Sequence, residues 1–235
     1  QEVLRLSVKF CKIPSTSVPP EQTNFDAIEK VKQKAVEYAE SKKLRVIEIS
    51  GDDSNPYPFL IFSFQENDPA QVFCADVALV GHLDVVSAQT EEQFIPYING
   101  NMLVGRGSAD MKTVVASQLS WMADQQAKQG SKPPIITMIS FCEENASLVQ
   151  HNTNTAIQVL RDDFGAEVEL AIVGERTGEM ESGHTLPVGP ICEANKGWRW
   201  YRGTGSQKVN GMCTLEILAS IIGPGFGPPE LFIKI

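Results

Sequence analysis

Three short apolar stretches of the chain each run directly into acidic or histidine side chains, and this pattern limits the possible folds more than any other feature. The stretches and the side chains that follow them are 77–80 with His82 and Asp84, 135–142 with Glu143 and Glu144, and 170–173 with Glu175. Apolar runs of this length are typical of strands covered on both faces. Because ligands bind beyond the carboxyl ends of strands in open α/β sheets, we expect these side chains to meet at one edge.

Stretches with helical periodicity separate these strands. Apolar side chains recur at helical spacing over 25–42, 111–122 and 156–164, and two further strands are indicated at 44–49 and 59–64. Strands that alternate with helices predict an α/β fold with a mostly parallel central sheet and helices on both faces. A length of 235 residues is sufficient for one such domain, so we expect residues 1–235 to form a single domain.

The overall charge excludes several classes of partner. The net charge is −9, from 20 basic and 29 acidic residues, and no basic stripe is present. Such a surface repels nucleic acid and anionic lipid, and no apolar run approaches the ~18–20 residues of a membrane span. The first residues lack a signal peptide's apolar stretch, and the five cysteines include no Cys-x-x-Cys pair. We expect a cytoplasmic protein with reduced thiols and no nucleic-acid or membrane partner.

The predicted sheet edge gathers more negative charge than it can hold without compensation. A glycine-bearing loop ahead of the helix at 111–122 delivers Asp110 to the same region as the acids that follow the three strands. Like charges raise each other's pKa, so the carboxylates must either bind protons or bind cations. Imidazole from His82 together with carboxylate oxygens suits Zn²⁺, with Co²⁺ or Mn²⁺ as alternatives. Two such ions would offset most of the charge.

Each motif has an ordinary interpretation when it is taken alone. His82 could be a strand-end histidine paired with a nearby acid, and Glu143-Glu144 could be a solvated surface pair. The order and strand-end placement of the motifs together favour a metal site. Nucleophilic catalysis is less favoured, because there is no Gly-x-Ser-x-Gly motif and because the two acids next to Cys142 would raise its thiol pKa.

Several stretches, in order along the chain, resemble the family of co-catalytic zinc peptidases and deacylases. That family includes acetylornithine deacetylase, succinyl-diaminopimelate desuccinylase, aminoacylase and carboxypeptidase G. The similar stretches are Ile13-Pro-Ser15, Gly81-His-Leu-Asp-Val-Val86, Gly105-Arg-Gly-Ser-Ala-Asp-Met-Lys112, Glu143-Glu144, Gly174-Glu-Arg-Thr177 and Lys196-Gly197. The resemblance implies the family's catalytic domain and hydrolysis of an amide bond in an N-acyl amino acid or small peptide.

The resemblance also implies a role for each site residue. His82 and Glu175 would bind one zinc, Glu144 would bind a second, and Asp110 would bridge the two. Glu143 would be the general base that moves a proton from water to the leaving amine. Asp84 would hydrogen-bond His82 and fix its tautomer.

The last third of the chain departs from the family pattern. Members of the family insert a smaller lid domain after a Lys-Gly pair such as Lys196-Gly197, and they later supply a histidine to the second zinc. This sequence has three histidines, His82, His151 and His184, and none follows residue 184. We therefore expect the lid, after about residue 200, to be largely absent and the second of two zinc sites to be weak.

Three explanations for this departure stay open. The chain could be a natural lidless enzyme that uses Glu230 or His184 instead, a part of a longer protein, or a non-catalytic binding protein on the same fold. Trp198, Trp200 and Tyr201 alternate with arginines and predict a strand. Without a lid, that strand would lie at the edge of the domain or pair with a second copy, so we expect a monomer or an atypical homodimer.

Overall fold

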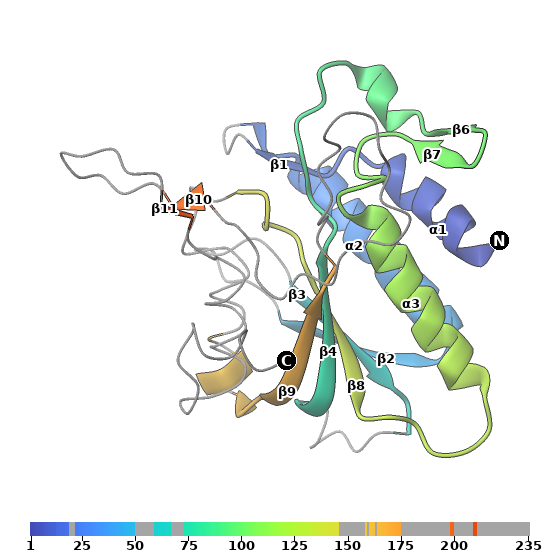
Figure 1. Cartoon of the computed structure of the whole chain (residues 1–235), viewed down its shortest axis with the longest axis vertical. Helices are drawn as coiled ribbons and strands as arrows, with labels where there is room; N and C mark the ends of the chain where they lie inside the picture. The colour runs from blue at the N-terminus through green and yellow to red at the C-terminus, as the bar shows by residue number, and fades with distance from the viewer. Residues whose placement is uncertain are drawn as a thin grey trace.

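A five-stranded sheet forms the centre of the computed structural model (Figure 1). The structure describes residues 1–18, 22–49, 59–66, 73–145, 158, 160–162 and 164–174, and the backbone of 198–199 and 209–210. The strands of the sheet are β2 (Leu44–Ile49), β3 (Phe59–Phe64), β8 (Ile135–Ser140), β4 (Cys74–His82) and β9 (Glu167–Val173), in that spatial order.

The strand directions place three carboxyl ends at one edge. β4 lies between β8 and β9 and pairs with both in parallel, whereas β3 is antiparallel to its neighbours β2 and β8. Four of the five strands therefore run in the same direction, and the predicted mostly parallel α/β sheet is confirmed. The central position of β4 puts its last residue, His82, between the ends of the two flanking strands.

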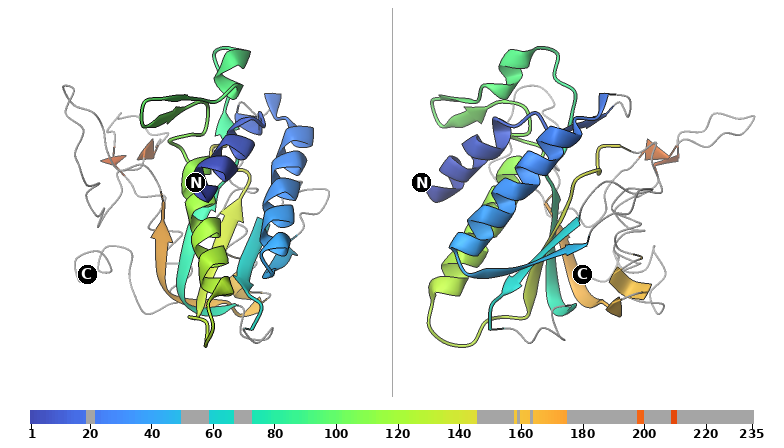
Figure 2. Two further views of the ribbon diagram at one scale, coloured as in Figure 1. Left: turned by 90° about the vertical axis from the view of Figure 1, so that its right-hand side faces the viewer. Right: turned by 180° about the vertical axis from the view of Figure 1, so that it is seen from behind.

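Three helices cover one face of this sheet (Figure 2). They are α1 (Glu2–Cys11), α2 (Phe25–Ser41) and α3 (Lys112–Ala127). α2 begins where the Asn24 side chain accepts a hydrogen bond from the Ala27 N–H, which satisfies one of the free donors of the first turn. Apolar residues from the helices pack against alternate residues of the strands, among them Phe62 and Ile139.

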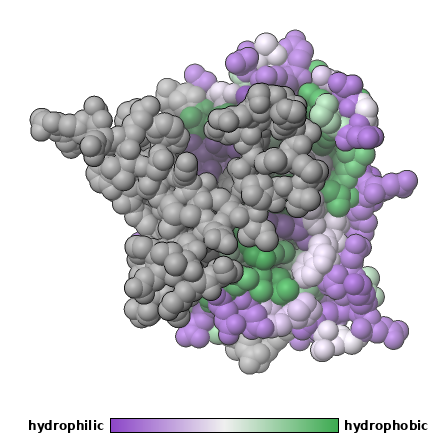
Figure 3. Space-filling view, in the orientation of Figure 1, coloured by the Kyte–Doolittle hydropathy of each residue, from purple (hydrophilic) through white to green (hydrophobic). Residues whose placement is uncertain are grey.

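The opposite face has its own apolar cluster. Ile61, Met138 and Val168 from three strands pack there with Leu160, which belongs to the helical residues described between 158 and 164. Described helical residues therefore lie on both faces, as predicted. On the α3 side of β9, Leu170 and Ile172 remain 40% and 48% exposed, and apolar side chains gather there on the surface (Figure 3).

Smaller elements surround the sheet edge that carries the candidate site. β1 (Thr16–Val18) pairs in parallel with β5 (Val85–Val86), directly after the end of β4. A short 3-10 helix and a two-stranded hairpin complete this region, and they are η3 (Glu91–Phe94), β6 (Tyr97–Asn99) and β7 (Met102–Val104). Among the described residues, no helix is both long enough and apolar enough to cross a membrane.

Some sequence expectations need correction. Pairing extends β4 beyond the predicted 77–80 at both ends, and it extends β9 beyond the predicted 170–173 at its N-terminal end, because backbone hydrogen bonds continue past the apolar residues. Of the strand predicted near residue 200, the structure describes β10 (Trp198–Arg199), which among the described residues pairs with β11 (Val209–Asn210) in a separate two-stranded sheet, while Trp200 and Tyr201 lie outside the described residues. A partner close in sequence costs little loop-closure entropy. α1 was not predicted.

A buried lysine connects α1 to the start of α3. Lys112 is fully buried, and its Nζ donates hydrogen bonds of 2.6 Å to the Ile13 carbonyl and 3.1 Å to the Phe10 carbonyl. Both carbonyls lie at the end of α1, where cations are favoured. Burial lowers the pKa of the Lys112 ammonium to about 8. The lysine therefore fixes the loop that precedes α3 to the N-terminal part of the chain.

Replacing this lysine tests its contribution to stability. We expect Lys112→Met to lower the free energy of unfolding by about 1–3 kcal/mol, because two hydrogen bonds from a charged donor are lost inside the protein. Urea denaturation measures the change. Lys128→Met, at the exposed C-terminal end of α3, is the control and should change stability little. If Lys112→Met is as stable as the unmodified chain or more stable, then burial of the ammonium costs at least as much free energy as its hydrogen bonds contribute.

Candidate metal centre

His82 lies at the centre of the site, at the carboxyl end of β4. Its side chain is 1% exposed. The ring Nδ1 is 3.0 Å from the backbone oxygen of Asp84 and 3.3 Å from its Oδ1. The ring Nε2 is 3.1 Å from Asp110 Oδ1 and 3.7 Å from Glu143 Oε2. A proton on Nδ1, held by Asp84, leaves Nε2 as the nitrogen that faces the other acids.

Close packing of α3 on the sheet brings Asp110 to His82. Asp110 precedes Met111, the N-cap residue of α3, and the peptide bond between them is cis. The first turns of α3 lie directly over Gly81 and Gly174, the glycines beside the ends of β4 and β9. A Cβ at Gly81 would lie 2.8 Å from Val115 Cγ2, and one at Gly174 would lie 2.3 Å from Val114 Cγ1. The glycines therefore permit the approach of α3.

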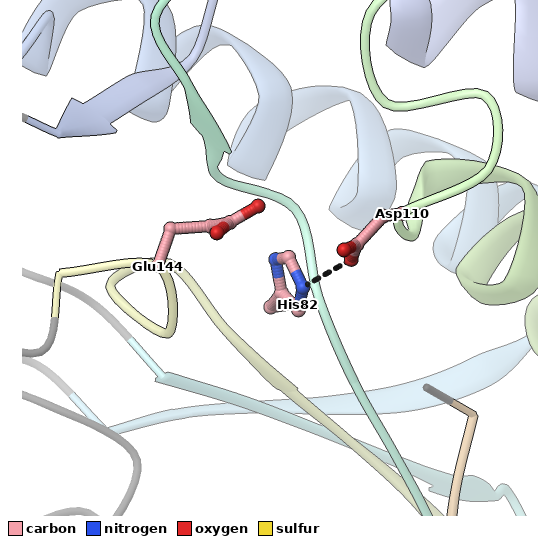
Figure 4. Close-up of side chains that lie close together, drawn as sticks. All are labelled: His82, Asp110 and Glu144. Carbon is pink, nitrogen blue, oxygen red and sulfur yellow. Dashed lines mark hydrogen bonds and ion pairs between the residues drawn. The ribbon is translucent and has the colours of Figure 1, made fainter. Parts of the chain in front are cut away.

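Glu143 and Glu144 follow β8, and their backbone is held by Asp84. The Asp84 carboxylate is fully buried and accepts hydrogen bonds from the Glu143 N–H at 3.2 Å and the Glu144 N–H at 3.1 Å. The Glu144 side chain reaches the site from this loop, Asp110 reaches it from the loop before α3, and His82 lies between them (Figure 4).

These three side chains could hold a metal ion. One ligand atom each from His82, Asp110 and Glu144 lies within 4.8 Å of the other two. Two ligands of a tetrahedral zinc ion lie about 3.3–3.6 Å apart, since each bond is ~2.0–2.2 Å long. His82 Nε2 and Asp110 Oδ1 are already 3.1 Å apart, and side-chain shifts of about 1–1.5 Å would complete the coordination. One imidazole nitrogen with carboxylate oxygens is a donor set that suits zinc, and also manganese or cobalt.

The pKa values in the cluster reflect the burial and mutual repulsion of acids that lie close together without a cation. Burial raises the pKa of Glu144 to about 7, and the neighbouring carboxylates add to the rise. Burial alone would lower the pKa of His82, but hydrogen bonds to Asp110 and Asp84 outweigh it and hold the pKa well above its usual value. Without a metal, the site therefore retains protons at neutral pH. A cation would replace them.

Asp84 differs from Glu144, because its pKa is lowered and it stays ionised. Burial raises its pKa, but hydrogen bonds from His82, the Ser17 hydroxyl and the Glu144 N–H outweigh burial and bring the pKa below its usual value. A carboxylate that accepts several hydrogen bonds is stabilised in its charged form.

The structure brings together five of the six predicted site residues. His82, Asp84, Asp110, Glu143 and Glu144 form one cluster. Glu175 lies outside the described residues, as do His151, His184 and Glu230. β9 nevertheless ends beside His82's strand, since Val80 pairs with Val173 and the Gly174 N–H donates to the Val80 carbonyl at 3.2 Å.

Sequence reasoning missed three buried polar residues around this cluster. Ser17 donates a hydrogen bond to Asp84, Asn145 donates to the Ser17 carbonyl, and Lys112 joins the site loop to α1. Only Lys112 gave a recognisable signal. It shares a helix face with Val115 and Leu119, and a lysine on an apolar helix face indicates a buried cation with partners.

The retained protons predict that cation binding depends on pH. A metal ligand must be deprotonated, so binding displaces the protons of His82 and Glu144. We expect the apparent affinity for a divalent cation to fall as pH falls through 7, by about tenfold per pH unit for each proton displaced. Calorimetric titration in two buffers with different ionisation enthalpies counts the released protons. An affinity that stays constant between about pH 6 and pH 8 would contradict these protonation states.

Comparison with known proteins connects this geometry to a family. The chain matches the model of peptidase family M20/M25/M40 over residues 78–217. Succinyl-diaminopimelate desuccinylase of Rickettsia felis is 30% identical over 151 residues, which cover 61% of this chain and 37% of that protein. The desuccinylase of Erythrobacter litoralis is 33% identical over 115 residues, which cover 48% of this chain and 29% of that protein. The chain thus spans less than two-fifths of the length of these relatives.

Solved structures agree with the fold. Human carnosine dipeptidase 1 matches with a TM-score of 0.60 and 19% identity, covering 75% of this chain and 39% of its own. An M20 family metallo-carboxypeptidase from Sulfolobus solfataricus matches with a TM-score of 0.52 and 18% identity, covering 74% and 37%. The match of the family model includes more than half of the chain together with His82, Asp110 and Glu144. The predicted resemblance is confirmed, and the chain belongs to peptidase family M20/M25/M40.

Proposed function

We propose that this chain is the catalytic domain of a zinc-dependent hydrolase that cleaves an amide bond in an N-acyl amino acid or small peptide. The observation that carries the proposal is the convergence of His82, Asp110 and Glu144 from three separate segments, with Glu143 beside them. His82 and Glu175 would hold one zinc, Glu144 a second, and Asp110 would bridge them. The family match supports the reaction class.

The donor set favours zinc, and the chemistry that zinc supplies fits amide hydrolysis. When bound, zinc acts as a Lewis acid towards the scissile carbonyl and lowers the pKa of the attacking water. Cobalt or manganese could replace it in vitro, because both accept imidazole and carboxylate ligands.

Glu143 has the position that a general base requires. Its side chain is 43% exposed, whereas His82 and Asp84 are buried. Its backbone N–H is fixed by Asp84, and its carboxylate lies 3.7 Å from His82 Nε2. A carboxylate that is fixed at its backbone and open at its tip can reach both water and substrate. In the proposed mechanism Glu143 takes the proton from the attacking water and passes it to the leaving amine.

The substrate class is inferred from the kinds of protein that the chain is similar to. The relatives from Rickettsia felis and Erythrobacter litoralis are named desuccinylases, and a structural neighbour is a dipeptidase. Both names describe cleavage of an amide bond next to an amino acid. We propose the N-acyl amino acid or small peptide as substrate, and we propose that residues 1–235 supply the catalytic domain, with the family's lid largely outside this chain.

Substitution of Glu143 separates catalysis from metal binding. We expect Glu143→Gln to leave the zinc content nearly unchanged and to lower hydrolysis by about 10²-fold or more, because the proton acceptor is lost. Glu144→Gln should lower the zinc content instead. Glu91→Gln, at an exposed acid outside the cluster, is the matched control. Zinc content is measured by elemental analysis, and activity on N-acetyl and N-succinyl amino acids and dipeptides.

The same experiment tests the alternatives. Loss of zinc in Glu143→Gln would make Glu143 a ligand and not the base. Zinc bound by the unmodified chain without turnover of any of these substrates would contradict an active domain and would favour the second candidate, a binding protein on the same fold.

A further inference from the structure

We propose that Ser17 of β1 is a positioning residue of the metal centre and that it acts through Asp84. The inference rests on the proposed function and extends it to a residue outside the predicted ligands and base. Ser17 is fully buried, and its Oγ donates a hydrogen bond of 2.6 Å to Asp84 Oδ2. The two residues are 67 positions apart in the sequence, so the contact exists only in the folded chain.

The Asp84 carboxylate controls the position of three metal-site residues at once. It lies 3.3 Å from His82 Nδ1, and it accepts the backbone N–H groups of Glu143 and Glu144. A rotation of this carboxylate would therefore move the imidazole of His82 and the backbone of the loop that carries the two glutamates (Figure 4 shows where His82 and Glu144 lie). The hydrogen bond from the Ser17 hydroxyl, at 2.6 Å, is shorter than the contacts of this carboxylate with the imidazole and with the two backbone N–H groups.

β1 holds the same loop at a second point. The Ser17 carbonyl accepts a hydrogen bond of 2.8 Å from Asn145 Nδ2, directly after Glu144. β1 is itself fixed by parallel pairing with β5, in which Thr16 faces Val85 and Val18 faces Val86. Ser17 thus connects a paired strand to both Asp84 and the residue that follows the glutamates. Outer groups that orient metal ligands typically change metal affinity by about 10–100-fold when they are removed.

Ser15 offers a matched control two residues earlier. It is also fully buried, and its Oγ also donates a 2.6 Å hydrogen bond, but the acceptor is the backbone carbonyl of Leu83 and not a site carboxylate. A general destabilisation of this segment should follow from the replacement of either serine. A change in zinc affinity that is transmitted through Asp84 should follow only from the replacement of Ser17.

The experiment measures zinc affinity of the full chain by competition with a fluorescent chelator, for Ser17→Ala and Ser15→Ala. We expect Ser17→Ala to weaken zinc binding by about 10–100-fold and to alter the visible absorption of the Co²⁺ form. Ser15→Ala should keep the affinity and the Co²⁺ spectrum of the unmodified chain. Thermal melting in chelator should show a loss of stability for both variants, with the larger loss in Ser17→Ala because its hydrogen bond is made to a charged carboxylate.

A double-mutant cycle tests the path through Asp84. In an Asp84→Ala background, Ser17→Ala should change zinc affinity by less than about threefold, since the partner is already absent. An undiminished effect in that background, an equal loss of affinity in Ser15→Ala, or unchanged zinc binding in Ser17→Ala would each overturn the inference. Failure of the unmodified chain to bind zinc would overturn the proposed function as well. Zinc binding by the unmodified chain together with any of the three results above would overturn the role of Ser17 alone.

Discussion

The buried Asp84 carboxylate is the group on which the arrangement of the candidate metal centre depends. A charged carboxylate with no exposed surface is costly unless hydrogen bonds replace the water it has lost. Asp84 accepts such hydrogen bonds from donors in three parts of the chain, which are Ser17 on β1, His82 on β4 and the backbone after β8. The need to satisfy one charge therefore brings together the segments that carry the site.

The scaffold fixes the fourth segment, the loop of Asp110, by a different means. Lys112 follows Asp110 by two residues and bonds two carbonyls at the end of α1, so the loop cannot move without breaking bonds to a charged donor. Glycines at the ends of β4 and β9 allow α3 to lie against the sheet edge. The position of Asp110 is consequently fixed by the packing of α3 on the sheet and by the hydrogen bonds of Lys112, although the Asp110 side chain itself is 46% exposed.

The sheet and the side chains that meet at its edge can be predicted from the sequence, but the buried groups that hold these side chains cannot. The strands at Leu44–Ile49 and Phe59–Phe64 were predicted with the observed bounds, because their apolar pattern ends abruptly at polar or turn residues. His82 and Glu144 could be predicted because strand ends share an edge when strands are parallel. That argument uses local patterns only.

No sequence pattern identifies the partners of Ser17 and Lys112, although the helix position of Lys112 indicates that it is buried. Their partners are 67 and about 100 positions away, and a serine in a short strand is common in any chain. Sequence periodicity tells which face of an element is buried, but not which buried polar groups meet across the fold. The position of Glu175 remains a prediction, because it lies beyond the described end of β9. Contacts at long sequence distance are therefore the part of this site that only the structure could supply.

The distribution of burial across the site follows the tasks that its residues would perform. His82 and Asp84 are almost inaccessible, whereas Asp110 and Glu143 are close to half-exposed. A ligand that sets geometry gains from burial, because a low dielectric strengthens the hydrogen bonds that orient it. A base that must reach water and substrate cannot be enclosed in the same way. Fixing the Glu143 backbone through buried Asp84, while its carboxylate stays open, meets both requirements within one hydrogen-bond network.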